Sequence, residues 1–193
     1  MPTPAAAGTA GCRKVAEPKA KPDGSRERPT LRLSASKAYS ATVRTSCGAF
    51  TVALDVERAP RTSASFVALA RGGFFDDTIF HRIVPGFVIQ GGDPTATGMG
   101  GPGYSVEEAP PQDLAYTRGV VAMAKTGAEA PGTSGSQFYV VTGEDAELPP
   151  EYALLGEVTD GLDVVETIGA VPTAGEDRPV DPVVIESVEV TEG

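Results

Sequence analysis

Apolar and polar residues alternate along much of the chain after residue 38, and this alternation predicts several short strands. Phe50, Val52 and Leu54 alternate with small or polar residues, which is typical of a half-buried strand. The small residues at 46–48 predict a hairpin turn after a preceding strand over 41–45. We expect further strands at about 118–124, 137–142, 153–158 and 183–190.

Two stretches have the spacing of helices instead. Pro60 suits the first turn of a helix, and a glycine pair at 72–73 is a stop signal for it. Between them, Phe66 and Ala70 are spaced for one buried face. A second, short helix is expected at about 161–168. Many strands with two separated helices predict a mainly β domain, and the pattern alone does not distinguish a barrel from a sandwich.

The segment 80–93 reads FHRIVPGFVIQGGD and departs from the pattern of a plain core strand. Its apolar residues flank Pro85-Gly86 and predict two short strands that meet at a break. This arrangement would aim Arg82, Phe87 and Gln90 into one concavity. Polar side chains within so apolar a stretch make it the first candidate for a functional site.

This segment closely resembles the first signature of the cyclophilins, the peptidyl-prolyl cis/trans isomerases. The sequence GSQFY at 135–139 resembles their second signature, and the two segments occur in the right order. The resemblance covers about residues 39–193. It implies a closed, antiparallel, eight-stranded barrel capped by two helices, with isomerase activity on X-Pro bonds in peptides and in unfolded or partly folded proteins.

Isomerisation of an X-Pro bond needs neither a nucleophile nor a titrating base, because no covalent bond is made or broken. The barrier of ~18–20 kcal/mol comes from amide resonance, so a catalyst needs a slot for the proline and a donor that favours the twisted amide. Arg82 offers a permanently charged, rigid fork of N–H groups, and Gln90 can orient it. By the resemblance, these residues are the catalytic arginine and glutamine.

The same resemblance implies a proline slot built mainly from apolar side chains. Its floor and walls would be Phe87, Phe138, Leu148 and Tyr152, with Val88, Ala124 and Tyr139 at the margin and Lys125 and Gln137 as further substrate contacts. Flat aromatic faces pack well against a pyrrolidine ring. Without the resemblance, Phe87 and Phe138 are equally well explained as core residues. A proline-peptide binding module or chaperone on the same fold, with incidental turnover, is therefore the alternative function.

The chain departs from the family pattern around this slot. Tyr152 stands where many members carry histidine, and Lys125 stands where an asparagine usually contacts the substrate. The loop from Lys125 to Gly132 is longer than the common spacing, so peptide selectivity is in doubt. Glu147 stands at the place of a rim tryptophan that donates to cyclosporin, and we therefore expect weak cyclosporin binding.

Composition and charge divide the chain into a tail and a body. Residues 1–38 hold eight of the 16 Lys and Arg and only three of the 26 acidic residues, so the remainder is strongly acidic. Such a body lacks the basic face that phosphate contacts need, and we expect no nucleic-acid binding. Residues 1–38 have few large apolar groups and are expected to be a flexible, solvated tail, with contact to an anionic surface as the alternative.

The two cysteines, Cys12 and Cys47, match neither a metal-binding spacing nor a disulfide framework. They can pair, but we expect them to be free. No apolar run reaches the length of a membrane span, and the N-terminus lacks the regions of a signal peptide. The expected localisation is cytoplasmic for the sequence as written, or extracytoplasmic if an anchor or signal precedes Met1. We expect a monomer.

Several other motif matches lack the context that their chemistry needs. Residues 98–103 match the dinucleotide-binding glycine pattern, yet Pro102 interrupts it and no amphipathic helix follows. Residues 132–136 resemble a nucleophile elbow without its closing glycine. His81, the only histidine, is interpreted as a hydrogen-bonded structural residue, so no zinc site or other cofactor is expected.

Overall fold

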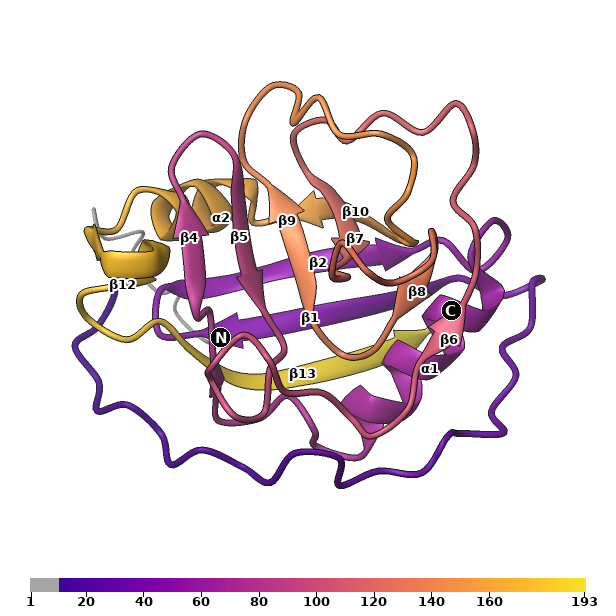
Figure 1. Ribbon diagram of the computed structural model, residues 1–193, viewed down its shortest axis with the longest axis horizontal. Helices are drawn as coiled ribbons and strands as arrows, with labels where there is room; N and C mark the ends of the chain where they lie inside the picture. Colours follow the sequence, from indigo (N-terminus) through magenta and orange to yellow (C-terminus); the bar gives the residue numbers. More distant parts are fainter. Residues whose placement is uncertain (1–10) are drawn as a thin grey trace, which may run out of the picture.

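The computed structural model describes residues 11–193, and a single curled antiparallel sheet forms its centre (Figure 1). The sheet has nine strands in the order β3 (Thr78–Ile79), β13 (Val184–Glu192), β1 (Tyr39–Thr45), β2 (Gly48–Leu54), β10 (Leu154–Asp160), β7 (Val120–Met123), β9 (Phe138–Val141), β5 (Val88–Gly91) and β4 (Arg82–Val84). The mainly β fold with two helices is therefore confirmed.

Two helices and two small sheets complete the domain. Helix α1 (Pro60–Arg71) packs against β13, and helix α2 (Leu162–Gly169) packs against β2, β5 and β4. The small sheets pair β6 (Val106–Glu107) with β8 (Thr133–Ser134), and β11 (Thr173–Ala174) with β12 (Arg178–Pro179) across the 3-10 turn η1 (Gly175–Asp177). Within residues 11–193, no helix combines the length and the apolar character that crossing a bilayer requires.

The main sheet curls so that its two edge strands, β3 and β4, are joined by a short connection. The strands β3 and β4 lie at opposite ends of the sheet order, yet only Phe80 and His81 separate them in sequence. The sheet has nine strands where eight were expected, because the two-residue strand β3 adds to β13. This junction delivers Arg82 directly to the first position of β4.

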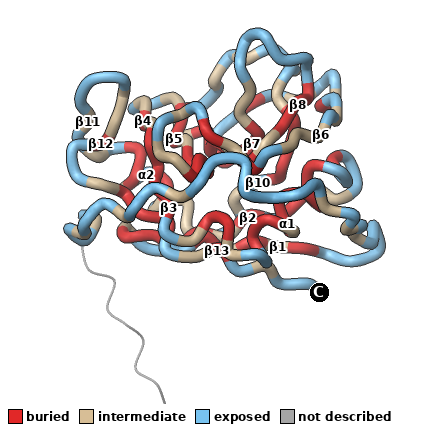
Figure 2. The backbone as a smooth tube through the Cα atoms, turned by 60° about the horizontal axis from the view of Figure 1, so that its bottom comes forward, coloured by how far each residue is buried: buried red, intermediate tan, exposed pale blue. Residues whose placement is uncertain are grey.

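Buried residues concentrate on the strands and on the inner sides of the helices, whereas the connecting loops are largely exposed (Figure 2). The main core lies inside the curled sheet and contains Phe50, Phe66, Phe75 and Phe80. A second, smaller apolar cluster contains Val88, Tyr116, Tyr139 and Leu154 among its buried members. The second cluster is the one that reaches the surface at the candidate site.

Residues 11–38 form a strap that lies against the domain and runs along the lower edge of the molecule in Figure 1. A disulfide joins Cys12 to Cys47 in the β1–β2 turn, so the expectation of free cysteines is wrong. The two cysteines are 35 residues apart in sequence, and the fold of the strap rather than a sequence motif brings them together. The expected flexible tail does not describe residues 11–38, and residues 1–10 lie outside the described part of the chain.

Polar contacts hold the strap, and Cys12, Leu31 and Leu33 also pack against the main core as partly buried residues. The backbone N–H groups of Lys21, Gly24 and Arg26 donate to the carbonyl oxygens of Pro94, Gly101 and Pro102, at 2.8, 3.1 and 2.8 Å. Arg13 pairs with Glu186, and Lys14 lies 3.8 Å from Asp181. Basic residues of the strap thus pair with acidic residues of its own domain, which is the acidic part of the chain by composition.

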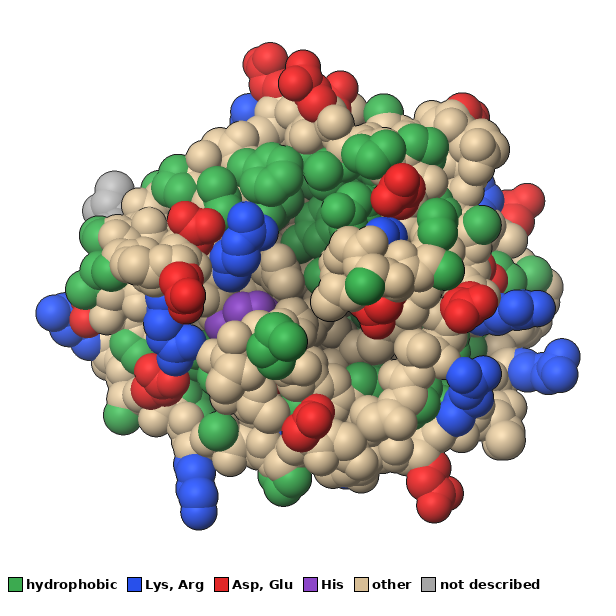
Figure 3. All heavy atoms as spheres, viewed as in Figure 1, with side chains coloured by type: hydrophobic (Ala, Val, Ile, Leu, Met, Phe, Trp, Pro, Cys, Tyr) green, Lys and Arg blue, Asp and Glu red, His purple; other side chains and the backbone are tan. Residues whose placement is uncertain are grey.

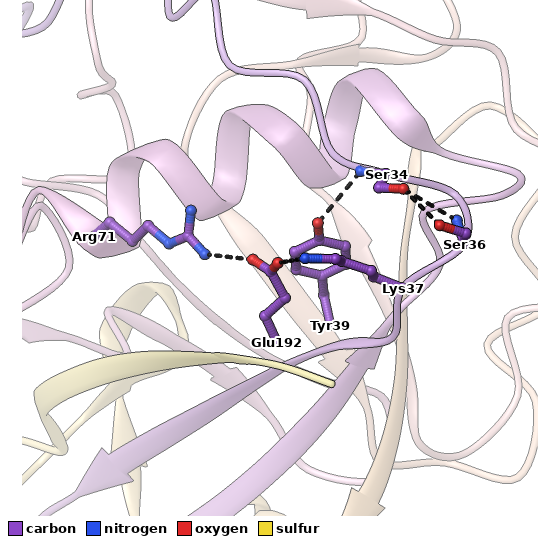
Figure 4. Close-up of polar contacts among 6 residues, drawn as sticks. All are labelled: Ser34, Ser36, Lys37, Tyr39, Arg71 and Glu192. Carbon is purple, nitrogen blue, oxygen red and sulfur yellow. Dashed lines mark hydrogen bonds and ion pairs between the residues drawn. The ribbon is translucent and has the colours of Figure 1, made fainter.

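The end of the strap meets both the last strand and helix α1. Glu192 accepts from Lys37 on one side, and its second carboxylate oxygen is 3.4 Å from Arg71 of α1 on the other (Figure 4). Its hydrogen bond from Lys37 and the nearby positive charges hold the pKa of Glu192 below its usual value. The tyrosine hydroxyl of Tyr39 accepts from the backbone N–H of Ser34 at 3.3 Å.

Candidate active site

The sheet register aligns the candidate residues in one row across neighbouring strands. Arg82 on β4 is opposite Gln90 on β5, Gln90 is opposite Tyr139 on β9, and Tyr139 is opposite Ala122 on β7. Directly opposed residues of antiparallel strands share one face of the sheet. The row therefore runs from a charged end at Arg82 to an apolar end at Tyr139.

Arg82 is held from two sides. Its Nη1 donates to Oε1 of Gln90 at 3.4 Å, and its Nε lies 3.5 Å from Oδ2 of Asp177 in the turn before β12. The Gln90 amide donates in turn to Oε1 of Gln137 at 3.0 Å, which fixes the orientation of its oxygen toward Arg82. The sequence predicted the contact between Arg82 and Gln90, and it gave no sign of Asp177.

Gln137 connects this arginine to the glycine-rich loop at 93–103. Its amide nitrogen donates to the carbonyl oxygens of Gly98 and Gly100, both at 3.0 Å. With its oxygen bound to Gln90 as well, the side chain is engaged within the protein. This arrangement suits a supporting role for Gln137 better than the predicted contact with substrate.

The apolar wall is centred on Tyr139. The ring centroid of Tyr139 is 5.7 Å from that of Tyr152, and Tyr116 lies 5.9 Å from Tyr152. Six partly exposed residues pack against this cluster, and they include the four predicted site residues Phe87, Ala124, Leu148 and Tyr152. Val88 lies beneath them as a buried member. Hydrophobic side chains gather around a hollow in the face shown in Figure 3.

Phe138 does not belong to this wall, so that part of the predicted slot is wrong. Phe138 is 1% exposed and lies in the main core, where its ring meets those of Phe66, Phe75 and Phe80 edge-on at 5.8–6.1 Å. Neighbouring residues of a strand face opposite sides of the sheet, so Phe138 and Tyr139 cannot both line the slot. Alternation along β9 leaves only one of the two residues for the wall, and the burial of Phe138 in the main core identifies that residue as Tyr139.

Lys125 is drawn into the site rather than extended into solvent. Its side chain is 4% exposed, and its Nζ lies 3.5 Å from Glu151 and 5.4 Å from the centre of the Tyr152 ring. The ammonium also donates to the carbonyl oxygens of Thr126 and Glu129, at 3.4 and 3.3 Å. The longer loop thus folds over its own lysine, and the wall gains a cationic edge next to Tyr152.

A groove of about 250 Å³ adjoins Gln90 and also touches Ala124 at the margin of the apolar wall. It lies between the glycine-rich loop and the loop after β7, with lining residues that include Gln90, Gly98, Tyr104, Lys125, Glu129 and Gln137. Met99 stands at this groove and is 83% exposed. An extended peptide whose proline lies against Tyr139 would have room here for the residues on one side of that proline.

His81 and Asp93 lie behind the row and are both buried. Burial lowers the pKa of His81, and Arg178 and Arg82 add to this effect against the opposing charge of Asp93. Neither ring nitrogen of His81 has a hydrogen-bond partner among residues 11–193, so the expected hydrogen bond is absent from this part of the chain.

Asp93 organises the glycine-rich loop. Burial raises its pKa, but hydrogen bonds from Thr95 and from the backbone N–H groups of Gly98 and Gly100 outweigh burial and hold the pKa below its usual value. Within the described part of the chain, no group of three or more His, Cys, Asp or Glu residues is arranged to hold a metal ion. The groups gathered along the row are one arginine, two side-chain amides and a set of aromatic rings.

Comparison with known proteins agrees with this geometry. The family model described as cyclophilin type peptidyl-prolyl cis-trans isomerase/CLD matches residues 40–190. Peptidyl-prolyl cis-trans isomerase A of Mycobacterium tuberculosis is 41% identical over 170 residues, which cover 79% of this chain and 92% of that protein. The isomerase-like protein 1 of Aspergillus oryzae is 43% identical over 152 residues, with 77% and 92% coverage.

Solved structures give the same result for the fold. A cyclophilin type peptidyl-prolyl cis-trans isomerase of Cryptosporidium parvum superposes with a TM-score of 0.74 at 33% identity and covers 80% of this chain and 98% of its own. A second structure of that protein, obtained in the presence of the dipeptide Ala-Pro, gives a TM-score of 0.74 at 31% identity, with 79% and 98% coverage. The chain therefore belongs to the cyclophilins and is a peptidyl-prolyl cis-trans isomerase.

Proposed function

We propose that Arg82 is the catalytic donor and that the wall around Tyr139 holds the proline ring of the substrate. The observation that carries this proposal is the row from Arg82 through Gln90 to Tyr139 on one face of the sheet. A proline packed on Tyr139, Phe87 and Leu148 would have its preceding amide within reach of the guanidinium. The charged group and the apolar slot are then the two parts that the reaction needs.

The mechanism follows from the electronic change during rotation of the amide. As the bond twists, resonance is lost and the proline nitrogen regains a lone pair. An N–H donor fixed beside this nitrogen binds it more strongly in the twisted state than in the planar ground state, which lowers the barrier. Gln90 contributes by holding one nitrogen of the guanidinium at 3.4 Å, so that the donor is oriented before the substrate twists.

The substrates we propose are proline-containing peptides and segments of unfolded or partly folded proteins. The related isomerase of C. parvum was crystallised in the presence of Ala-Pro, which supports a site that engages a dipeptide unit. The open groove beside Gln90 supports binding of longer chains, because it leaves room for residues beyond the proline. We propose that the protein acts as a monomer.

Replacement of Arg82 tests the mechanism. We expect Arg82→Ala to lower kcat/KM for a short X-Pro peptide by about 10²–10³-fold, the usual scale for losing one preorganised donor, with a much smaller change in peptide affinity. Arg82→Lys should recover only part of the loss, because a point charge does not reproduce the fork. Near-normal turnover by Arg82→Ala would instead favour the alternative of a proline-peptide binding module.

We further propose that cyclosporin binds weakly, because of Glu147. This residue is exposed, has a positive φ of 51° and directly precedes Leu148 of the apolar wall. A carboxylate at the rim accepts hydrogen bonds but cannot donate one, and burial of its charge against an apolar ligand is costly.

The variant Glu147→Trp tests this interpretation of the rim. It should strengthen inhibition by cyclosporin while leaving turnover of a short peptide nearly unchanged, since such a peptide need not reach the rim. Leu148→Ala serves as the comparison, because it should weaken peptide turnover as well. Tight inhibition of the unmodified protein would show that Glu147 does not contact the ligand.

The disulfide supports an oxidising compartment for the protein, the second of the two localisations considered from the sequence. Disulfides persist in extracytoplasmic environments and are rare where thiol buffers keep cysteines reduced. Alkylation of the protein in its native cells, followed by mass spectrometry, should find Cys12 joined to Cys47. Recovery of both cysteines as alkylated thiols would favour the cytoplasm.

A further inference from the structure

Asp177 and Gln90 contact different nitrogens of the Arg82 guanidinium. Its Oδ2 is 3.5 Å from Nε of Arg82, while Oε1 of Gln90 is 3.4 Å from Nη1. The two contacts engage different nitrogens of the planar guanidinium, and together they restrict its rotation about the last bonds of the side chain. A group held at both points presents its remaining N–H groups in a defined direction.

The turn that carries Asp177 is itself built to hold a position. Glu176 and Asp177 have positive φ values of 60° and 59°, a conformation that non-glycine residues adopt only where the surrounding structure enforces it. The hairpin of β11 and β12 closes the turn by pairing Thr173 with Pro179 and Ala174 with Arg178.

Arg178, the next residue, anchors the turn to two other parts of the molecule. Its Nη1 donates to the carbonyl oxygen of Ala96 in the glycine-rich loop at 2.8 Å, and its Nη2 pairs with Glu17 of the strap at 2.6 Å. The carboxylate of Asp177 is thus presented from a turn that is held by the hairpin pairing and by the contacts of Arg178. An ordinary surface ion pair forms between mobile side chains, whereas this one is supported by an anchored turn.

We propose that Asp177 is a positioning residue for the isomerisation and that it acts by fixing the guanidinium of Arg82. This inference rests on the proposed role of Arg82 as the donor. Asp177 need not touch the substrate, because its effect passes through the arginine. A preorganised donor loses less freedom when the amide twists, so removal of the restraint should slow the chemical step rather than weaken peptide binding.

Solvent exposure limits the effect of Asp177 on kcat and makes that effect depend on salt concentration. The side chains of Arg82 and Asp177 are 39% and 47% exposed, so dissolved salt can screen their attraction. The unmodified enzyme should therefore lose part of its kcat on an uncharged peptide as salt is added. An enzyme without the Asp177 carboxylate should lack this part of the salt dependence.

The principal test compares Asp177→Asn with Asp177→Glu and with Glu176→Gln as the matched control. Glu176 is an exposed acid in the same turn, and its carboxylate pairs with no group within residues 11–193. We expect Asp177→Asn to lower kcat about three- to tenfold, with KM changed less than twofold. This loss of kcat lies between the small effect of breaking an exposed ion pair and the large effect of misplacing a catalytic group. Asp177→Glu should recover part of the loss, and Glu176→Gln should match the unmodified enzyme.

A double-mutant cycle separates failure of this inference from failure of the proposed mechanism. In the background of Arg82→Ala, Asp177→Asn should have no further effect on kcat, since the group that it positions is gone. Unchanged or increased kcat in Asp177→Asn, with Arg82→Ala still strongly impaired, overturns the positioning role alone. Normal kcat in Arg82→Ala overturns the proposed mechanism. Salt titration of the unmodified enzyme decides the matter without a variant, because a kcat independent of salt also overturns the inference.

Discussion

Among single residues, Tyr139 contributes its ring to the apolar wall but buries a hydroxyl, which lowers the stability of the folded protein. The residue is 4% exposed, and its hydroxyl has no hydrogen-bond partner among the described residues. Burial, with nearby Tyr116 and Tyr152, raises its pKa, so the hydroxyl stays protonated throughout the working range. By contrast, the hydroxyl of Tyr116 donates to the carbonyl oxygen of Tyr152 at 2.7 Å. The two tyrosines therefore differ in what their hydroxyls contribute.

This difference predicts opposite effects of two similar substitutions. Tyr139→Phe removes an unpaired buried hydroxyl and should raise the free energy of unfolding by about 1 kcal/mol, whereas Tyr116→Phe breaks a hydrogen bond and should lower it by about the same amount. Urea unfolding of the three proteins measures both changes. Destabilisation by Tyr139→Phe would mean that its hydroxyl has a partner, and a loss of turnover would identify the substrate as that partner.

Sequence could predict Arg82 and Gln90 because the polar residues stood out within an apolar segment with a recognisable pattern. It could not order Phe138 and Tyr139 correctly, because both are aromatic and the choice depends on which face of β9 turns toward the core. Asp177 gave no signal either. Its contact with Arg82 joins segments that are far apart in sequence, and only the hairpin of β11 and β12 brings them together.

At the scale of elements, the strap shows where composition misleads. Every large element was predicted within a few residues, because strands and helices carry a periodic pattern of apolar residues. The strap has no such pattern and is fixed by backbone hydrogen bonds, ion pairs, one disulfide and the packing of a few apolar residues such as Leu31 and Leu33. Three of those hydrogen bonds reach the loop at 93–103, whose carbonyl groups bind Gln137. The strap therefore contacts the same loop that supports Gln137 beside the active site.

A protein that begins near Lys37 should still fold, because the core lies within residues 39–193. Loss of the disulfide should nevertheless lower the free energy of unfolding by about 2–4 kcal/mol, which Cys12→Ser tests in the full chain. Dithiothreitol should destabilise the unmodified protein and leave Cys12→Ser unaffected. Equal stability of the two proteins without reductant would show that the disulfide does not stabilise the domain.

At the scale of the whole molecule, burial of the single histidine links stability to pH. The pKa of His81 is lowered in the folded protein, so below about pH 6.5 the unfolded chain binds a proton that the folded chain does not. Stability contributed by neutral His81 is therefore complete above that pH and is lost as the pH falls. The catalytic arginine does not titrate in this range, so stability and activity should respond differently.

We expect kcat to be nearly constant between about pH 6 and 9, because the proposed mechanism has no titrating group. Between pH 7.5 and 5.5 the free energy of unfolding should decrease, by at most about 1.4 kcal/mol per pH unit for one histidine. His81→Gln should flatten that decrease while keeping turnover. A steep change of kcat near pH 6.5 that disappears in His81→Gln would give the histidine a direct part in the reaction.

The position of β13 in the sheet determines at what point of synthesis the active site can be completed. This last strand pairs with β1, the first strand of the sheet, on one side and with β3 on the other. The sheet cannot be completed around the junction that leads into Arg82 until β13 has left the ribosome, although nearly all of the site residues are made earlier. A molecule of this design is therefore inactive during its own synthesis, and it cannot catalyse isomerisation of X-Pro bonds in its own nascent chain.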